Sequence, residues 1–457
     1  MKLRLGDVTT DKAYALLITT SNEPISGEIS GWGSTVSIAP PNQRISAPYL
    51  AVARISFDNL RPSTKYSYSI SQGAETTFGS FTTLPDSKTA PFSFIVGTCD
   101  GPIRRNPTDS FQTIRKLVQQ SSIPVLFMAT IDDVHYVDEF EVNDGSGFTS
   151  SGKPQDTGRA EDYALGWAAH FGMFDSEGKW QMVDRQWVYR NLPHICSGGD
   201  HMIEGNHCRG KIGADDYHGC DRSPGGLEEV AVAEWNLFYG STNPPPLRAG
   251  ELYWGKEVGP LKIASSDMQL HCEPYNDAAG PTDTPMLGNQ QINDIMAYLD
   301  DQNMPFKLMF HESGFSQTGQ PWLEWHTTEA QMWKAKLDST PSLNGTSGSF
   351  FAIYGDVHAC HAVSYDTFWA FGAGTLGDAN SVGHGFVNYD FGWGGNLEFL
   401  WSSTNKKADT LIGGFYHIIV HADRTPQEIE VNFIKGGSGE IMFSRKITYL
   451  ANNNQFS

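Results

Sequence analysis

The sequence predicts an α+β protein in which an N-terminal β-sandwich, residues 1–86, precedes a layered α/β domain, residues 87–457. Three observations predict this order. Residues 1–86 carry strand patterns and no helical pattern, the residues after them alternate apolar runs with amphipathic helical patterns, and residues 386–450 return to mostly strands. A chain of 457 residues is also long enough for two domains.

The sandwich is predicted from short apolar or alternating runs that polar, Pro- and Gly-rich turns separate. These runs lie at residues 14–19, 49–57 and 66–70. The stretch from Leu60 to Tyr66 resembles the L-x-P-x-T-x-Y corner of a fibronectin type III sandwich, in which the tyrosine closes a loop over the core. Residues 78–85 would then be the last strand and the exit from this domain.

The second domain is predicted from its alternation of strands and helices. Amphipathic helices are expected at residues 110–120, 228–238 and 289–299, and the last of these places its apolar residues on one face. Buried strands are expected at 92–96, 125–129, 195–196 and 350–354, and later strands at 415–421 and 429–434.

Composition and charge exclude several kinds of partner. The net charge of −20 argues against sequence-blind binding to nucleic acid or to anionic membranes. The apolar runs are shorter than a membrane span, and the first residues lack an apolar signal region. The sequence has no Gly-rich P-loop with lysine and no G-x-S-x-G elbow, which weighs against nucleotide-triphosphate cradling and against a serine hydrolase.

The six cysteines form no C-x-x-C pair, so a structural zinc cluster is not expected. Cys208 and Cys220 bracket a Gly-rich loop, and two readings stay open for them: a disulfide in an oxidising compartment, or buried thiols. Cys99 differs from the others because it ends a predicted strand beside Asp100.

Polar residues with metal-binding side chains follow four of the predicted strands. Each residue alone has a plainer reading: a buried thiol for Cys99, core packing for Tyr136 and a turn cap for Asp133. Together they are the residue types that bind hard and borderline cations. The sequence therefore predicts a metal site built from strand ends that carry Cys99, Asp133, Tyr136, Asp200, His201, Asn206, His207, Asp356 and His358.

These motifs, taken in order, resemble the PhoD-like branch of the metallophosphatases over nearly the whole chain. Residues 94–99 are similar to its strand ending in Gly-Ser-Cys, and residues 126–138 to its G-D-x-x-Y-x-D block, with Asp132 in place of the glycine. Residues 199–206 resemble its D-D-H-E-x-x-N block, with Gly199 for the first Asp and Met202 for the Glu. Residues 286–291 resemble its L-G-x-x-Q helix start, and residues 355–358 match its G-D-x-H block. The resemblance implies a domain of two packed mixed sheets flanked by helices, in α/β/β/α order.

The resemblance also implies a site and an activity. Fe(III) would be held by Cys99, Asp133, Tyr136 and His358, and Ca²⁺ by Asp133, Asn206 and Asp356, although the residue types alone would equally allow Zn or Mn. Asp200, His201 and His207 would orient ligands or protonate the leaving oxygen. The expected activity is hydrolysis of phosphomonoesters or phosphodiesters, including nucleotide or lipid-derived substrates, by a metal-bound water. The resemblance also favours an extracytoplasmic or secreted location.

The sequence departs from the family where phosphate would bind. The family has D-x-R-x-x-R after the next strand, whereas this chain has His271 at the place of the second arginine. Arg209 is the candidate to take over part of that role, because a histidine cannot replace a bidentate guanidinium. Two alternatives therefore stay open: a metal hydrolase of another ester, and a catalytically weak relative with a structural, adhesive or binding role in an extracellular assembly. His311, at the end of another predicted strand, is a further candidate ligand.

Overall fold

The structure is a computed structural model. It describes residues 1–100, 110–132, 134, 136, 142, 148–173, 182–203, 224–271, 285–315, 326–344, 349–355, 360–374, 376, 393–401 and 413–449.

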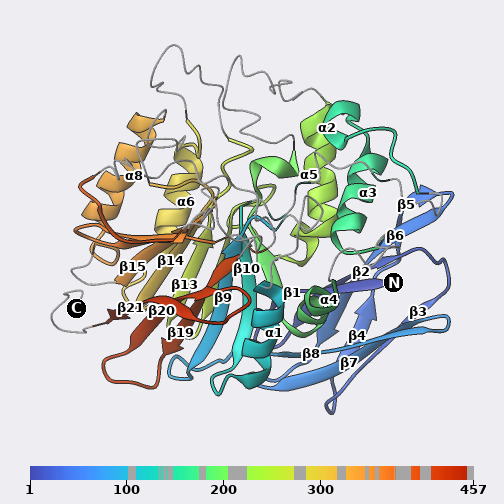
Figure 1. The fold of residues 1–457 in the computed structure, drawn as a ribbon, viewed down its shortest axis with the longest axis horizontal. Coiled ribbons are helices and arrows are strands. Elements are labelled where there is room, and N and C mark those ends of the chain that lie inside the picture. Colours follow the sequence, from blue (N-terminus) through green and yellow to red (C-terminus); the bar gives the residue numbers. More distant parts are fainter. Residues whose placement is uncertain are drawn as a thin grey trace.

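Residues 1–82 form two sheets of their own, and Figure 1 shows them in blue at one end of the molecule. The first sheet has five strands: β1 (Lys2–Val8), β2 (Ala13–Thr19), β6 (Tyr49–Asp58), β4 (Thr35–Ile38) and β5 (Asn42–Ser46). The second has three strands: β3 (Ile25–Ile29), β7 (Lys65–Gln72) and β8 (Glu75–Thr82). The strands predicted at residues 14–19, 49–57 and 66–70 are confirmed, and residues 1–86 contain no helix.

The predicted tyrosine corner is present. The backbone N–H of Arg61 donates a hydrogen bond of 2.8 Å to the hydroxyl of Tyr66, so the side chain closes the loop that precedes its own strand. The rings of Phe57, Tyr68 and Phe81 cluster beneath this corner, with Phe57 and Tyr68 centroids 5.0 Å apart. This aromatic cluster holds the two sheets together, because each ring removes a large apolar surface from water.

The remaining strands form two larger sheets. A six-stranded sheet has the order β11 (His194–Cys196), β10 (Val125–Ile131), β9 (Phe92–Thr98), β19 (Gly414–His421), β20 (Glu428–Lys435) and β21 (Ile441–Thr448). Strands β9, β10 and β11 run parallel, and β19 runs antiparallel to β9. A seven-stranded sheet has the order β12 (Trp254–Val258), β13 (Leu261–Ser265), β14 (Phe306–His311), β15 (Ser349–Tyr354), β17 (Trp369–Gly372), β16 (Cys360–Ser364) and β18 (Asn396–Trp401).

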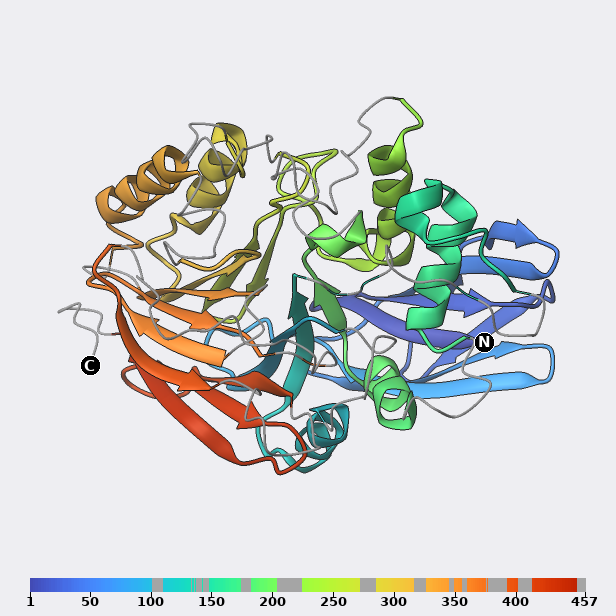
Figure 2. The same cartoon turned by 45° about the horizontal axis from the view of Figure 1, so that its top comes forward.

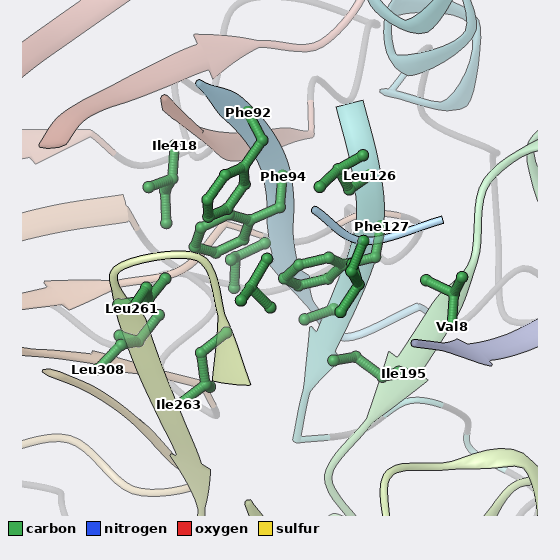
Figure 3. Close-up of a cluster of buried hydrophobic side chains, with 14 of the residues drawn as sticks. Val8, Phe92, Phe94, Leu126, Phe127, Ile195, Leu261, Ile263, Leu308 and Ile418 are labelled. Carbon is green, nitrogen blue, oxygen red and sulfur yellow. The ribbon is translucent and has the colours of Figure 1, made fainter. Parts of the chain in front are cut away.

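The two large sheets bury apolar side chains against each other. Phe94 and Phe127 of the six-stranded sheet belong to one buried cluster with Ile263 and Leu308 of the seven-stranded sheet (Figure 3). The parallel strands are buried along their whole length, which explains why they read in the sequence as continuous apolar runs.

The helices flank the sheets, and those within residues 160–191 also pack against strands β1, β5 and β8 of the sandwich sheets (Figures 1 and 2). One buried cluster joins Ile95 and Met128 to helices α1 (Ser110–Gln120), α3 (Ala160–His170), α4 (Met182–Asn191) and α5 (Leu227–Phe238). Another joins Met309 and Ala352 to α6 (Asn289–Leu299) and α8 (Thr327–Ser339). Three shorter helices are α2 (Pro154–Thr157), η2 (Asp200–Met202) and η3 (Gly240–Thr242).

The predicted helices at residues 110–120, 228–238 and 289–299 are confirmed, and with them the mixed α/β class. None of the helices in the described ranges is long and apolar enough to cross a membrane.

Buried polar contacts join the sandwich sheets to the rest of the chain. Arg4 of β1 donates hydrogen bonds to the carbonyl oxygens of His194 (2.8 Å) and Phe238 (2.9 Å), and its guanidinium lies 4.0 Å from the centre of the Tyr239 ring. Asp7 of the same strand forms a buried ion pair with Lys256 of β12. The first strand of the chain therefore fixes the positions of elements from both large sheets.

Candidate functional site

The carboxyl ends of three buried strands meet at one place. Strand β9 ends in Thr98 before Cys99, β10 ends in Ile131 before Asp132, and β15 ends in Tyr354 before Gly355. A Cβ added at Gly355 would overlap the Cβ of Asp132 and lie 2.8 Å from the Thr98 hydroxyl oxygen. The ends of the two large sheets are therefore in contact here. Asp133, Asp356 and His358, which follow these strands, lie outside the described residues.

Two residues at this meeting point have a left-handed backbone. The φ angle of Cys99 is 49° and that of Asp132 is 57°. Non-glycine residues adopt this conformation at a cost in free energy, and residues held in it occur preferentially at functional sites. The Cys99 side chain is fully buried, and its sulfur lies 3.2 Å from the Thr98 hydroxyl oxygen. The backbone N–H of Asp132 donates a hydrogen bond of 2.9 Å to the Ser197 hydroxyl of the next strand end.

Tyr136 and His201, both predicted from the sequence as site residues, are neighbours. Their ring centroids lie 4.2 Å apart, and the exposed fractions of the two residues are 4% and 5%. His201 belongs to η2, which follows β11, so the structure brings the segments after β10 and β11 together. Asp200 is the first residue of η2, but its side chain lies outside the described residues, as do Asn206, His207 and Arg209.

A buried carboxylate from the seven-stranded sheet approaches the same edge. Glu312 follows β14 and accepts hydrogen bonds from the Met268 backbone N–H (3.1 Å) and the Gln269 side-chain amide (3.2 Å). A Cβ added at Gly198, after β11, would lie 3.9 Å from a Glu312 carboxylate oxygen. Sequence reasoning did not select Glu312, although its place directly after a fully buried strand is the same signal that selected the other strand ends.

His311 is fully buried at the end of β14. Its Nδ1 lies 2.7 Å from the carbonyl oxygen of Ser313, and burial lowers the pKa of the imidazole to about 4. The ring is therefore neutral near pH 7, the protonation state that a metal ligand requires. The backbone N–H of Gly355 donates a hydrogen bond of 3.2 Å to the His311 carbonyl oxygen, which places this candidate one strand away from the G-D-x-H segment.

His271, predicted from the sequence as a substrate-binding residue, has a carboxylate partner. Its Nε2 lies 2.7 Å from a carboxylate oxygen of Glu251, and both side chains are about a quarter exposed, at 29% and 23%. A carboxylate beside this imidazole is a poor neighbour for an anionic substrate, because it presents a like charge to the phosphate.

A buried ion pair lies directly behind Cys99, and sequence reasoning missed it. The Arg185 Nη2 donates a hydrogen bond of 2.5 Å to Asp100, and the Tyr189 hydroxyl donates one of 3.1 Å to the same carboxylate oxygen. The Arg185 side chain is 3% exposed and that of Asp100 is 0% exposed. Burial raises the pKa of the Asp100 carboxyl, and the neighbouring guanidinium opposes that shift. The pair fixes the backbone next to the thiol.

Three cysteines, Cys99, Cys196 and Cys360, are described, and all three are buried. Burial raises the pKa of the Cys196 thiol to about 12, so this thiol stays protonated and chemically inert near neutral pH. Cys208 and Cys220 lie outside the described residues, and their pairing stays a prediction.

Comparison with known proteins does not identify a family for this chain. No family model and no curated protein matches the sequence. Among solved structures, an amylomaltase from Corynebacterium glutamicum is 10% identical, with a TM-score of 0.15 over 78% of this chain and 62% of that chain. The chain thus spans less than two thirds of the amylomaltase, and a likeness at this TM-score establishes neither a shared fold nor a shared function.

Proposed function

We propose that this protein is a metal-dependent phosphoric ester hydrolase of the PhoD-like type, acting on phosphomonoesters, phosphodiesters or both. The observation that carries the proposal is the contact between the ends of β9, β10 and β15 at Thr98, Asp132 and Gly355, with Cys99 and Asp132 in a left-handed backbone. A metal centre with ligands from both sheets requires this contact, because its ligands must come within a few ångströms of one ion.

The described residues at this edge fit such a centre in their chemistry. Cys99 and Tyr136 are buried where loops from both sheets begin, and thiolate and phenolate are donors that suit Fe(III). Asp133 and His358 would complete that site, and Asp133, Asn206 and Asp356 would hold Ca²⁺, with Zn or Mn as alternatives. The metals, when bound, supply an ionised water at neutral pH and neutralise charge on the phosphoryl group.

The remaining roles belong to side chains of the chain itself. His201 lies against Tyr136 and would hold a proton for the leaving oxygen, with Asp200 and His207 as its proposed partners. Arg209 and His271 would contact the phosphoryl oxygens. The α/β/β/α layering of the family is part of this proposal, and the buried clusters on either side of the two large sheets support it.

The alternative is a weak or inactive relative with a binding role in an extracellular assembly. The contact between His271 and Glu251 favours it, because the imidazole at the place of the family's second arginine is already engaged by a carboxylate. The buried Asp132, 3% exposed, adds negative charge at the same edge. Both features oppose the binding of an anionic ester.

Elemental analysis combined with an ester assay tests the proposal. We expect iron and a second metal in the purified protein, and turnover of an aryl phosphate or a bis-aryl phosphate. Asp133→Asn and Cys99→Ser should lose iron and turnover together. Cys196→Ser is the matched control and should leave both unchanged, because the Cys196 thiol is buried beside Asn243 at the end of β11.

Three outcomes separate the hypotheses. Metal with turnover of a phosphate ester supports the proposal, and metal with turnover of carboxylic or sulfate esters alone supports a different esterase. Metal-free protein without turnover on any ester would overturn the enzyme interpretation in favour of the binding role.

A further inference from the structure

A second group of metal-binding side chains lies at the opposite end of the six-stranded sheet. His421 is the last residue of β19 and pairs directly with Glu428, the first residue of β20. Glu430 lies two positions further along β20, so its side chain is on the same face as that of Glu428. One ligand atom from each of the three residues lies within 4.8 Å of the other two.

The spacing of these atoms suits a bound ion. The His421 Nε2 and the Glu430 Oε2 are 3.5 Å apart, which is long for a hydrogen bond to a carboxylate. Two ligand atoms about 2.0–2.2 Å from a tetrahedral Zn²⁺ ion lie roughly 3.4 Å from each other. The observed separation therefore matches two ligands of one ion better than it matches a strong direct hydrogen bond.

A neighbouring amide orients the central carboxylate. The side-chain amide of Asn432 donates a hydrogen bond of 2.8 Å to the Glu430 Oε1, which leaves the Oε2 to face His421. Asn432 is itself 2% exposed. Ligating carboxylates in metal sites are commonly held by such outer hydrogen bonds.

A second imidazole lies on the same face, beside Glu430. His417 pairs with Asn432 in the ladder, is 5% exposed, and its Nε2 has no hydrogen-bond partner. The Glu430 carboxylate is close enough to act electrostatically on this ring. A buried imidazole nitrogen without a partner costs free energy, although His417 is not among the residues whose ligand atoms lie within 4.8 Å of one another.

Two exposed cationic side chains contact the group from solvent. Arg424 and Lys446 approach the same Glu428 oxygen, at 2.6 Å and 3.3 Å, and their side chains are 46% and 55% exposed. Exposed ion pairs of this kind contribute little, so an ion with a double charge can displace them. The second oxygen of Glu428 is not part of either ion pair.

We propose that His421, Glu428 and Glu430 form a binding site for a divalent transition-metal ion such as Zn²⁺, separate from the proposed catalytic centre. One imidazole with two carboxylates suits Zn²⁺ better than Ca²⁺ or Mg²⁺, which select oxygen ligands. The ion would join the two strand ends that residues 422–427 connect, and so hold the β19–β20 hairpin closed.

Zinc titration of the chelator-treated full chain tests the site. The parent protein carries Cys99→Ser and Asp133→Asn, so that the proposed catalytic centre does not contribute. Calorimetry should show one Zn²⁺ bound, with affinity reduced at least about tenfold in His421→Ala and in Glu430→Gln, and about tenfold in Asn432→Ala. The control is Glu257→Gln, which replaces an exposed carboxylate paired with Lys262 and should bind Zn²⁺ as the parent does.

A second readout keeps the result interpretable. Zn²⁺ should raise the unfolding temperature of the parent and of Glu257→Gln, but not that of His421→Gln, whose zinc-free unfolding temperature reports whether it folds. Equal zinc affinity and equal stabilisation in the parent and both His421 variants would overturn the site. The residues differ from those of the proposed enzyme centre, so either proposal can fail without the other.

Discussion

The two ends of the six-stranded sheet place similar chemical groups in opposite surroundings. At the carboxyl end of β9, Asp100 and Arg185 form an ion pair whose side chains are 0% and 3% exposed. At the other end, the Glu428 side chain, 16% exposed, meets Arg424, which is 46% exposed. The same carboxylate–guanidinium contact therefore has very different energetic consequences, because water solvates one pair and not the other.

Burial makes the ion pair between Asp100 and Arg185 costly in free energy unless its geometry is good. Removing two charges from water costs several kcal/mol per ion, and only good geometry with further hydrogen bonds offsets it. Tyr189 supplies one such hydrogen bond to Asp100, and His170 lies 3.0 Å from the Arg185 Nη2. The exposed end has no such requirement, so its side chains remain free to exchange one partner for another. A fixed catalytic geometry fits the first end, and a replaceable ion fits the second.

The largest expected effect tests this contrast directly. Arg185→Met should lower the free energy of unfolding by about 3–5 kcal/mol, because it leaves the Asp100 carboxylate buried without its cation. Arg424→Met should change the same quantity by less than about 1 kcal/mol. Urea denaturation of both variants at pH 7.5 measures the difference, and equal losses would show that the two ends do not differ in this way.

A double variant sharpens the same comparison. Arg185→Met combined with Asp100→Leu removes both charges, and should recover much of the stability that Arg185→Met loses. The loss of unfolding free energy in the double variant could instead equal the sum of the losses in the two single variants. In that case the cost comes from packing around Tyr189 and Phe111 and not from an isolated charge.

Much of the fold could be predicted from the sequence, because its signals are local. The helix at Ser110–Gln120 and the strand at Phe92–Thr98 follow from apolar periodicity and from a continuous apolar run. The Tyr66 corner follows from a short motif whose hydrogen bond spans five residues. Each of these signals lies within a single segment of the chain.

The ion pair behind Cys99 could not be predicted in this way. Asp100 and Arg185 are 85 positions apart, and Arg185 lies in a helix with charged and apolar residues in no clear stripe. Only the packing of α4 against β1, β8 and α1 decides that this arginine is buried. Similarly, the sequence predicted that strand ends would converge, whereas the contact of Gly355 with Asp132 depends on how two separate sheets face each other.

A second, smaller effect concerns His194, a buried imidazole at the start of β11. Burial, together with Arg4 and Arg185, holds the pKa of His194 well below its usual value. The unfolded chain takes up a proton near pH 6.5 and the folded chain does not, so the free energy of unfolding should fall as the pH drops below about 6.5. Above that pH both states are neutral, and this residue adds no pH dependence.

His194→Gln isolates this contribution. The free energy of unfolding from urea titrations between pH 7.5 and pH 5 should decrease less steeply in the variant than in the wild type. The two proteins share all other titrating groups, so the difference in slope belongs to His194. Parallel slopes would mean that the ring takes up its proton in the folded protein, and that the buried side of the sheet around His194 tolerates charge.

The smallest effect tests backbone strain, which also separates the two ends. Asp132 has a φ of 57°, a conformation that glycine adopts freely, that Asp tolerates and that Ala resists. Asp132→Gly should therefore be about 1 kcal/mol more stable than Asp132→Ala.

At the opposite end His421 lies in a regular strand, where the order of stability should reverse. The free energy of unfolding of His421→Ala should exceed that of His421→Gly by about 0.5–1 kcal/mol. Thermal and urea unfolding of these four variants gives both differences. If alanine were at least as stable as glycine at both positions, Asp132 would not be strained. That result would remove one of the two observations that mark this strand end as a functional site.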